Sequence, residues 1–237
     1  FILGKEVKLF ESRFSKFCSS KYSISCGNGT DALFLALKSL DLPQNSEVIV
    51  PAMTWVSTIS SIIHCGYKPI LVDVEKDTLC LDLTQVKKKI NSRTKGIILV
   101  NPNGRFPSID IEEILNFCKK NKLFLIEDSA QGLGSFYSDG THMGLKGSIG
   151  SLSFSAPKII STGQGGALIT NNFKLANKIK KIKDFGRYKG GNDIHDTFGI
   201  NSKFTDIQAV IGIEQMKKLK TRIKLKKNIY NYYKEEL

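Results

Sequence analysis

The chain has 237 residues and a formal net charge of +13, with 41% hydrophobic and 24% charged residues. This composition excludes a disordered, collagen-like or coiled-coil chain. The length suits one large or two small domains, and no apolar run approaches the roughly 18 residues of a membrane span. Residue 1 is Phe and not Met, so we do not expect Phe1 to be the natural start. Charged sequence follows at once, so we expect no signal peptide.

Hydrophobic periodicity predicts helices that alternate with short apolar strands. The expected helices cover residues 6–19, 30–40, 54–65, 82–90, 109–121, 173–182 and 205–234. The expected strands cover residues 22–26, 47–50, 69–74, 96–100, 123–127, 151–155 and 166–170. Thr30 is the expected N-cap of its helix, and residues 131–150 form a glycine-rich connection.

Strands separated by helices indicate an α/β fold, with a mostly parallel sheet covered by helices on both faces. Ligands of such sheets bind outside the carboxyl ends of the strands. The polar segments that follow the strands are therefore the most informative: 27–30, Trp55, 101–105, 128–131 and 153–158.

The five cysteines are Cys18, Cys26, Cys65, Cys80 and Cys118. Their number is odd and no two have C-x-x-C spacing, which argues against a disulfide framework and against a zinc site. The three scattered histidines give no metal-ligand pattern either, so we expect no metal. A reduced, cytoplasmic protein is the simplest interpretation.

Only five of the 35 basic residues are Arg, and the lysines fall on helix faces. Nucleic-acid-binding proteins usually combine Arg, aromatic residues and a recognisable module, so we expect no nucleic-acid partner. Solvated helix faces explain most of the charge, and attraction of a polyanionic small molecule such as a nucleoside diphosphate is the alternative.

The turn at residues 27–30 (GNGT) follows a strand and opens a helix. Such a turn directs backbone N–H groups and a hydroxyl toward an anion, with support from the helix dipole. It matches neither a Walker A loop nor a dinucleotide fingerprint. A plain helix cap is the alternative.

Asp128 follows a hydrophobic strand, and Lys158 lies 30 residues later between apolar segments. A carboxylate at the mouth of a sheet can hold a ring nitrogen protonated, and an enclosed lysine can form a Schiff base. The alternatives are a helix cap or structural ion pair for Asp128, and a surface side chain for Lys158.

Five segments in order resemble the DegT family of nucleotide-sugar aminotransferases, which belong to the fold-type I pyridoxal 5'-phosphate (PLP) enzymes. They are 27–33 (GNGTDAL), 51–58 (PAMTWVST), 126–134 (IEDSAQGLG), 153–166 (SFSAPKIISTGQGG) and 199–212 (GINSKFTDIQAVIG). The resemblance implies that residues 1–237 form the PLP-binding large domain with an N-terminal helical segment, and that the small C-terminal domain is absent or truncated.

The resemblance also implies roles. Lys158 would bond to PLP and move the substrate proton, Asp128 would pair with the pyridinium nitrogen, and Trp55 would stack on the ring. The remaining cofactor contacts would come from Gly29, Thr30, Gln131, Ser153 and Asn201.

Asn201 would reach the phosphate of a neighbouring subunit in a homodimer, and capping of the last helix is the alternative. Lys203 stands where the family often has Arg, and Gln164 where it often has Glu. Arg105 and Arg187 are candidate substrate contacts.

The implied activity is transfer of an amino group from glutamate or glutamine to a keto sugar of a nucleoside diphosphate, for polysaccharide or lipopolysaccharide biosynthesis. A perosamine-synthase-like reaction at C4 of a 4-keto-6-deoxy sugar is one form. A PLP- or PMP-dependent sugar dehydratase of the same fold is the second alternative, although such enzymes are known for His where this chain has Lys158. A non-catalytic fragment is the third.

Overall fold

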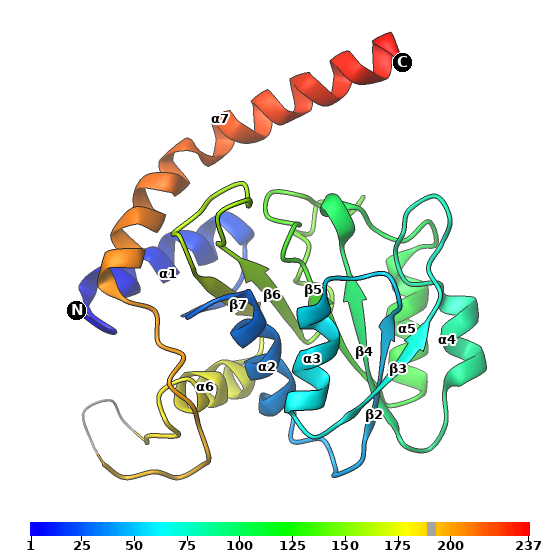
Figure 1. Ribbon diagram of the computed structural model, residues 1–237, viewed down its shortest axis with the longest axis horizontal. Helices are drawn as coiled ribbons and strands as arrows, with labels where there is room; N and C mark the ends of the chain where they lie inside the picture. The colour runs from blue at the N-terminus through cyan, green and yellow to red at the C-terminus, as the bar shows by residue number, and fades with distance from the viewer. Residues whose placement is uncertain (189–192) are drawn as a thin grey trace.

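The computed structural model describes residues 1–188 and 193–237, and a seven-stranded sheet forms its centre (Figure 1). The strands are β1 (Tyr22–Cys26), β2 (Glu47–Pro51), β3 (Lys68–Val72), β4 (Thr94–Val100), β5 (Phe124–Asp128), β6 (Ile149–Ser153) and β7 (Gly166–Thr170). Their spatial order is β1-β7-β6-β5-β4-β2-β3. β7 is antiparallel to both of its neighbours, and the other pairs are parallel. The predicted mostly parallel α/β sheet is confirmed.

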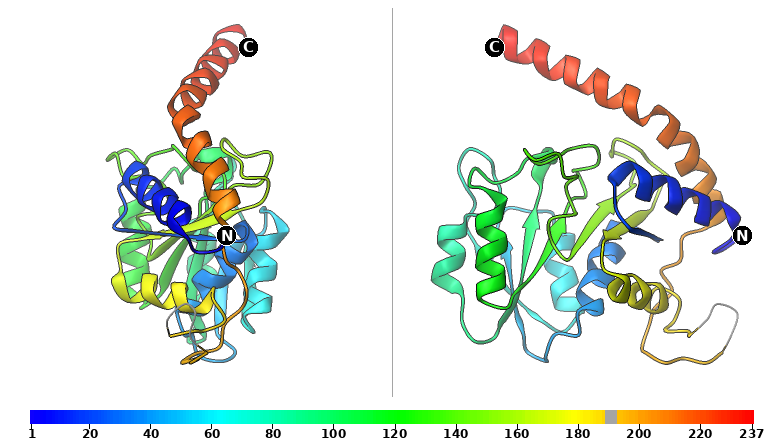
Figure 2. Two further views of the ribbon diagram at one scale, coloured as in Figure 1. Left: turned by 90° about the vertical axis from the view of Figure 1, so that its left-hand side faces the viewer. Right: turned by 180° about the vertical axis from the view of Figure 1, so that it is seen from behind.

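Helices cover both faces of this sheet (Figures 1 and 2). They are α1 (Lys5–Cys18), α2 (Gly29–Ser39), α3 (Val56–His64), α4 (Leu83–Lys89), α5 (Ile111–Lys120), α6 (Phe173–Ile182) and α7 (Asp206–Glu236), with a 3-10 turn η1 (Pro102–Gly104). One core joins α2, α3 and α6 to the sheet. On the opposite face, α1 and the start of α7 pack near β6 and β7, and α4 and α5 pack near β2, β4 and β5.

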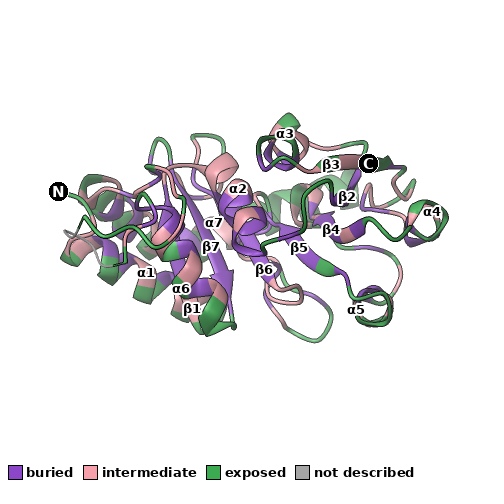
Figure 3. Ribbon diagram, turned by 90° about the horizontal axis from the view of Figure 1, so that it is seen from below, coloured by how far each residue is buried: buried purple, intermediate pink, exposed green. Residues whose placement is uncertain are grey.

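The central strands are buried, whereas most of the edge strand β3 and the outer helix faces are not, as Figure 3 shows. Alternate residues of a strand therefore enter opposite cores. Ile126 of β5 belongs to the core beneath α2 and α3, whereas Leu125 belongs to the core beneath α5. This alternation decides on which face each acid at the end of β5 lies.

The first half of α7 packs on α1, and its second half extends away from the sheet (Figure 2). Ile213 and Leu219 are buried, whereas Leu225, Ile229 and Tyr233 are exposed. No helix in the described parts of the chain is both long and apolar enough to cross a membrane.

Most predicted elements are present, with ends that shift by one or two residues. The strands at 22–26 and 166–170 and the helix at 173–182 are confirmed at both ends. One prediction was wrong, because α2 begins at Gly29 and its N-cap is Asn28, whose side-chain oxygen accepts from Asp31 N at 2.8 Å. The short turn η1 was not predicted. The five cysteines are free and buried.

Candidate active site

The carboxyl ends of the parallel strands and the N-termini of α2 and α3 meet at one edge of the sheet (Figure 1). This follows from the chain order, because each helix that follows a strand begins at the edge where that strand ends. The polar segments singled out in the sequence follow β1, β2, β4, β5 and β6. The fold therefore gathers them at one mouth.

Asp128 ends β5 and lies on the face covered by α3. Thr58 Oγ1 donates to Asp128 Oδ2 at 2.8 Å, and Ala130 N donates to Oδ1 at 3.2 Å. Burial raises the pKa of Asp128, while these hydrogen bonds and the charge of Lys158 act in the opposite direction. No helix begins at Asp128 in the described chain, so the helix-cap alternative is wrong.

The neighbouring acid, Glu127, enters the opposite face of the sheet. Its carboxylate accepts from Tyr137 Oη at 2.6 Å, Gly144 N at 2.9 Å and Gly147 N at 2.6 Å. These bonds fasten the glycine-rich segment between β5 and β6 beneath the sheet. The hydrogen bonds to Glu127 therefore stabilise the fold, whereas Asp128 faces the site.

Lys158 lies in the connection from β6 to β7. Burial lowers its pKa, and the nearby carboxylate of Asp128 acts in the opposite direction. The side chain is thus half-buried and within electrostatic reach of Asp128, which disfavours a freely solvated surface lysine. The sequence context predicted that Lys158 is the enclosed lysine of this chain. In the structure Lys183 is more deeply buried, with 3% of its surface exposed.

The loop that carries Lys158 is fixed at several points. Phe154 opens it and is fully buried against Phe10 and Phe14 of α1, with ring centroids 5.2–5.4 Å apart. Phe154 N donates to Gly165 O at 2.8 Å, which closes the loop at its base. Such packing restricts the positions that Lys158 can occupy.

Arg222 of α7 provides a further anchor for this loop. Its Nη1 donates to the carbonyl oxygen of Ile159 at 2.9 Å, directly after Lys158. An open groove of about 480 Å³ lies between the loop and α7, and Lys158 and Arg222 both line it. No local pattern in the sequence indicates this contact, because 63 residues separate its partners.

Gly29, Thr30 and Ser153 form a cradle at the start of α2. A Cβ at Gly29 would lie 2.8 Å from Cβ of Ser153, so only glycine permits this approach. Thr30 Oγ1 donates to Ser57 Oγ at 2.8 Å. Within the described residues, no acceptor receives the backbone N–H groups of Gly29 or Thr30, and such first-turn donors bind anions.

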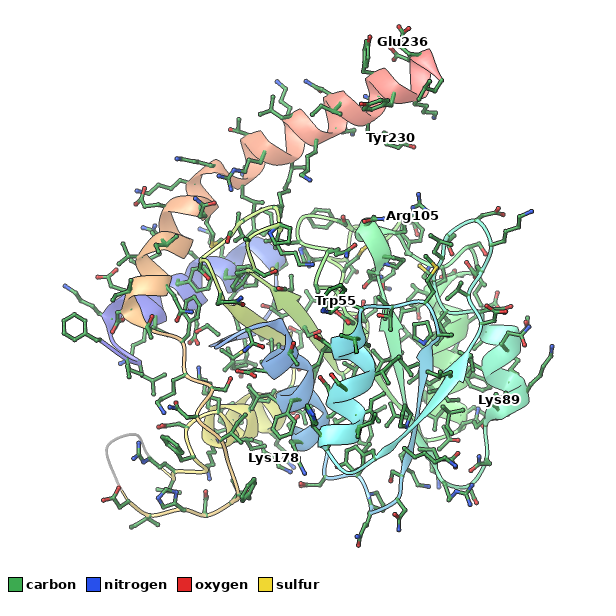
Figure 4. All side chains as sticks on the ribbon, in the orientation of Figure 1. Trp55, Lys89, Arg105, Lys178, Tyr230 and Glu236 are labelled. Atoms are coloured by element: carbon green, nitrogen blue, oxygen red, sulfur yellow. The ribbon has the colours of Figure 1, made fainter. Side chains whose placement is uncertain are left out.

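Trp55 and Gln131 border the same mouth. Trp55 precedes the first turn of α3 and is 76% exposed (Figure 4). Gln131 Oε1 accepts from Asn103 N at 2.7 Å, which links the loop after β5 to η1. Arg105 is the C-cap of η1 at this edge and is exposed, with Nη1 3.4 Å from Asp77 O.

Asn201 lies in a different region, between α6 and α7. The next residue, Ser202, accepts from Gly27 N at 3.1 Å through its carbonyl, which brings this segment beside the start of α2. Arg187 belongs to the same connection, where it pairs with Asp184 at 3.3 Å. Among the described residues, no hydrogen bond or ion pair joins Asn201 or Arg187 to Lys158.

The alternative role of Asn201 as a helix cap is wrong. α7 is capped by Thr205, whose Oγ1 accepts from Gln208 N at 3.2 Å, and Gln208 Oε1 accepts from Thr205 N at 3.0 Å. This reciprocal pair is a capping box. Asn201 is therefore available for another role.

Thr58 is a site residue that the sequence analysis did not single out. It follows Thr54 by one helical turn, and the two hydroxyls are 2.8 Å apart. The signal was present in the segment PAMTWVST, where two threonines share one face of a predicted helix. The sequence did not indicate that Asp128 is the partner of Thr58, because 70 residues separate the two.

Comparison with known proteins gives consistent matches. The model of the DegT/DnrJ/EryC1/StrS aminotransferase family matches residues 1–237. GDP-perosamine synthase of Vibrio cholerae is 33% identical over 99% of this chain, and dTDP-3-amino-3,6-dideoxy-alpha-D-galactopyranose transaminase of Aneurinibacillus thermoaerophilus is 35% identical over 100%. A crystal structure of a DegT DnrJ EryC1 StrS aminotransferase from Brucella abortus has a TM-score of 0.93, at 30% identity over 99% of this chain.

The chain spans only part of each of these proteins. It covers 63% of the Vibrio protein, 64% of the Aneurinibacillus protein and 64% of the Brucella structure. The matches extend over the five segments at the mouth of the sheet, including those that carry Asp128 and Lys158. The chain belongs to the DegT/DnrJ/EryC1/StrS aminotransferase family.

Proposed function

We propose that the full-length protein is a PLP-dependent aminotransferase that moves an amino group from glutamate or glutamine to a keto sugar of a nucleoside diphosphate. The observation that carries the proposal is the pair formed by buried Asp128 and half-buried Lys158 at one mouth of the sheet. Perturbed titratable groups that face each other across such a mouth are typical of functional sites. Family membership supports the same reaction class.

The residues at this mouth fit PLP. The cradle of Gly29, Thr30 and Ser153 offers unpaired backbone donors at a helix N-terminus, which suits the phosphate. Asp128 accepts only two hydrogen bonds from described residues, so its carboxylate retains room for the ring nitrogen. Trp55 would cover the ring, and Gln131 would lie near its 3-hydroxyl group.

When bound, PLP supplies an electron-withdrawing ring that accepts charge from the reacting carbon. Asp128 holds a proton at the ring nitrogen, because a buried carboxylate favours a cation beside it. Lys158 has a lowered pKa, so more of its amine is neutral than in an exposed lysine. Its Nζ would hold the cofactor until the amino donor displaces it, and the released amine would then carry a proton between the substrate carbon and the cofactor.

We infer that the acceptor is a 4-keto-6-deoxy sugar aminated at C4. The name of the Vibrio relative supports a GDP-linked sugar, and the Aneurinibacillus relative shows that the family also includes dTDP-linked 3-amino sugars. Arg105 lies at the mouth and is a candidate contact for the diphosphate. Lys158 supports transamination over dehydration, because the resemblance implies His at this position in the enzymes that remove a C3 hydroxyl from a 4-keto sugar.

We also propose a cytoplasmic homodimer. Free, buried thiols suit a reducing compartment. In a C₂ dimer each subunit would present Asn201 to the other. Arg187, in the same connection, is the second candidate substrate contact.

Two experiments test the reaction and the cofactor. The full-length protein is incubated with PLP, glutamate or glutamine, and 4-keto-6-deoxy sugars linked to GDP, dTDP or UDP, and the products are read by mass spectrometry. We expect the mass change that replaces a carbonyl oxygen by hydrogen plus an amino group. Borohydride reduction and peptide mapping should place the cofactor on Lys158, and an adduct on another lysine would refute the assignment.

Mixing two variants tests the dimer, at a PLP concentration that loads the wild type but leaves Asn201→Ala without cofactor. Lys158→Ala and Asn201→Ala should complement each other, because a hybrid dimer then contains one site with both defects and one intact site. With random exchange, about a quarter of the wild-type activity should return. If mixing restores nothing while each variant remains folded, Asn201 acts within its own subunit.

A further inference from the structure

Lys203 lies inward in this chain, although it occupies the position where the family often has Arg. Only 9% of its side chain is exposed. The ammonium lies 3.4 Å from Asp184 Oδ1 and 3.9 Å from the ring centroid of Phe185. A lysine held in this way by its own chain is not free to reach a ligand.

The third partner of Lys203 is Asn201. Lys203 Nζ lies 2.5 Å from Asn201 Oδ1 and donates to it. A lysine ammonium has three donors and no acceptor, so the amide atom that faces it must be the oxygen. This requirement fixes the amide orientation on chemical grounds.

The other end of the amide is therefore its NH₂ group. Asn201 is exposed, and in the described part of the chain no residue accepts from its Nδ2. With the oxygen turned toward Lys203, the outward side of the amide offers the two donors of its NH₂ group. A group of this kind recognises an anionic oxygen.

The charged neighbours of Asn201 are paired with one another. Asp184 is shared by Lys203 and Arg187, at 3.4 Å and 3.3 Å, and Arg187 also lies 3.9 Å from Asp193. The preference for an anion therefore comes from the outward amide and not from net charge. A cation that donates to the amide oxygen also polarises the amide, which makes its N–H groups better donors.

The segment itself is held firmly. Ser202 Oγ donates to Asp31 Oδ2 at 2.6 Å, and Ser202 N donates to Lys183 O at 3.0 Å. Asp31 lies in the first turn of α2, and Lys183 is the C-cap of α6. Asn201 is thus presented from a fixed backbone, and its remaining freedom is the rotation of the amide.

We propose that Lys203 is a positioning residue that holds the Asn201 amide with its oxygen inward and its NH₂ group outward, toward a phosphate oxygen. The inference rests on the proposed function, in which Asn201 contacts the PLP phosphate. Lys203 then acts through Asn201 and makes no contact of its own with the phosphate. Without Lys203, Asp184 would attract the NH₂ group and turn the oxygen outward.

Binding of PLP and of pyridoxal to the apo full-length protein tests this arrangement. Pyridoxal lacks the phosphate and is the matched control. Asn201→Ala should weaken PLP binding by about 10- to 100-fold, the range for a lost hydrogen bond to a charged group. Lys203→Met keeps the aliphatic stem over Phe185 and removes the donor, and it should weaken PLP binding by about 3- to 10-fold. Neither variant should change pyridoxal binding by more than about twofold.

The double variant separates positioning from direct contact. Lys203→Met/Asn201→Ala should bind PLP as Asn201→Ala does, within about twofold, because Lys203 has nothing left to position. Lys203→Arg keeps a donor and should bind within about threefold of wild type. Lys203→Leu replaces Lys203→Met if the latter does not fold.

Each contrary result has a distinct meaning. If the effects of Lys203→Met and Asn201→Ala multiply in the double variant, Lys203 touches the phosphate directly and the proposal is overturned. If Lys203→Met weakens PLP and pyridoxal equally, its role is structural and the proposal is again overturned. If Asn201→Ala binds PLP as tightly as wild type, the assigned role of Asn201 fails. If the protein binds no PLP at all, the proposed function fails.

Discussion

The two acids that end β5 differ in a way that separates fold from chemistry. Glu127 and Asp128 are adjacent, both are buried, and burial raises the pKa of both. Strand geometry places them on opposite faces of the sheet. Glu127 receives three hydrogen bonds from its own chain, whereas Asp128 receives two and lies within reach of the charge of Lys158.

This comparison shows that burial alone does not identify a functional carboxylate. A buried acid whose lone pairs are satisfied by backbone N–H groups and a phenol is a structural anchor. A buried acid with spare acceptor capacity, opposite a half-buried lysine, is prepared for an external cationic donor. The distinction rests on partners, which can be tested one acid at a time.

The largest expected effect is that of Asp128→Asn on turnover. The amide keeps the shape of the side chain but cannot hold a proton at the ring nitrogen by charge. We expect a loss of two to four decades in the rate of the half-reaction with the amino donor, about 2.7–5.4 kcal/mol in the barrier. Single-turnover kinetics of the full-length variant measure it, and a wild-type rate would show that Asp128 is only structural.

Glu127→Gln should produce the opposite pattern. Gly144 N donates to one carboxylate oxygen and Gly147 N to the other, so the amide NH₂ would face a backbone N–H in either orientation. At least one buried donor then loses its acceptor, at a cost of about 1–3 kcal/mol in the free energy of unfolding. Chemical denaturation measures this loss, and the single-turnover rate should stay within a few-fold of wild type. A rate loss as large as that of Asp128→Asn would remove the distinction between the two acids.

Much of this contrast was readable from the sequence. The strand 123–127 and the acid after it followed from hydrophobic patterning, and the ordered segments pointed to Asp128 and Lys158. The sequence also predicted that both lie at one mouth, because carboxyl ends of parallel strands meet there. These inferences use local pattern and topology, which a single chain carries in its own order.

The partners could not be read in the same way. Thr58 with Asp128, Tyr137 with Glu127, and Arg222 with Ile159 join residues from separate elements, and no local pattern encodes such pairs. The cap of α2 shows a finer limit, since Asn28 and Thr30 are both acceptable cap residues in one short turn. Which of them caps the helix depends on the position and direction of the chain as it leaves β1.

Thr58→Val sharpens the comparison by removing one of the two donors to Asp128. Valine keeps the shape and removes the hydroxyl, so the pKa of Asp128 should rise further, since the hydrogen bond from Thr58 lowers it. The acidic limb of the pH profile of kcat/KM should move to higher pH, while the plateau stays within a few-fold of wild type. Thr58→Ser retains the donor and is the control, and an acidic limb that does not move would show that this bond has no influence on Asp128.

The smallest expected effect concerns stability as a function of pH. Burial raises the pKa of Glu127 in the folded state above its ordinary value of 4.5. For a carboxyl group with a raised pKa, the folded state binds its proton more tightly than the unfolded state does, so the stabilisation is complete below the ordinary pKa. It is lost as pH rises from 4.5 through the higher folded-state pKa.

The variant Glu127→Gln provides the reference for this pH dependence, because the amide that it introduces does not titrate. The free energy of unfolding of the wild type should therefore exceed that of the variant most strongly at low pH, and this difference should shrink toward neutral pH. Denaturant unfolding of both proteins at a series of pH values measures it. A difference that grows with pH would mean that the three donors outweigh burial and hold Glu127 as a carboxylate. The same series with Asp128→Asn shows whether the second acid follows the same rule, because the pKa of Asp128 is raised by the same cause.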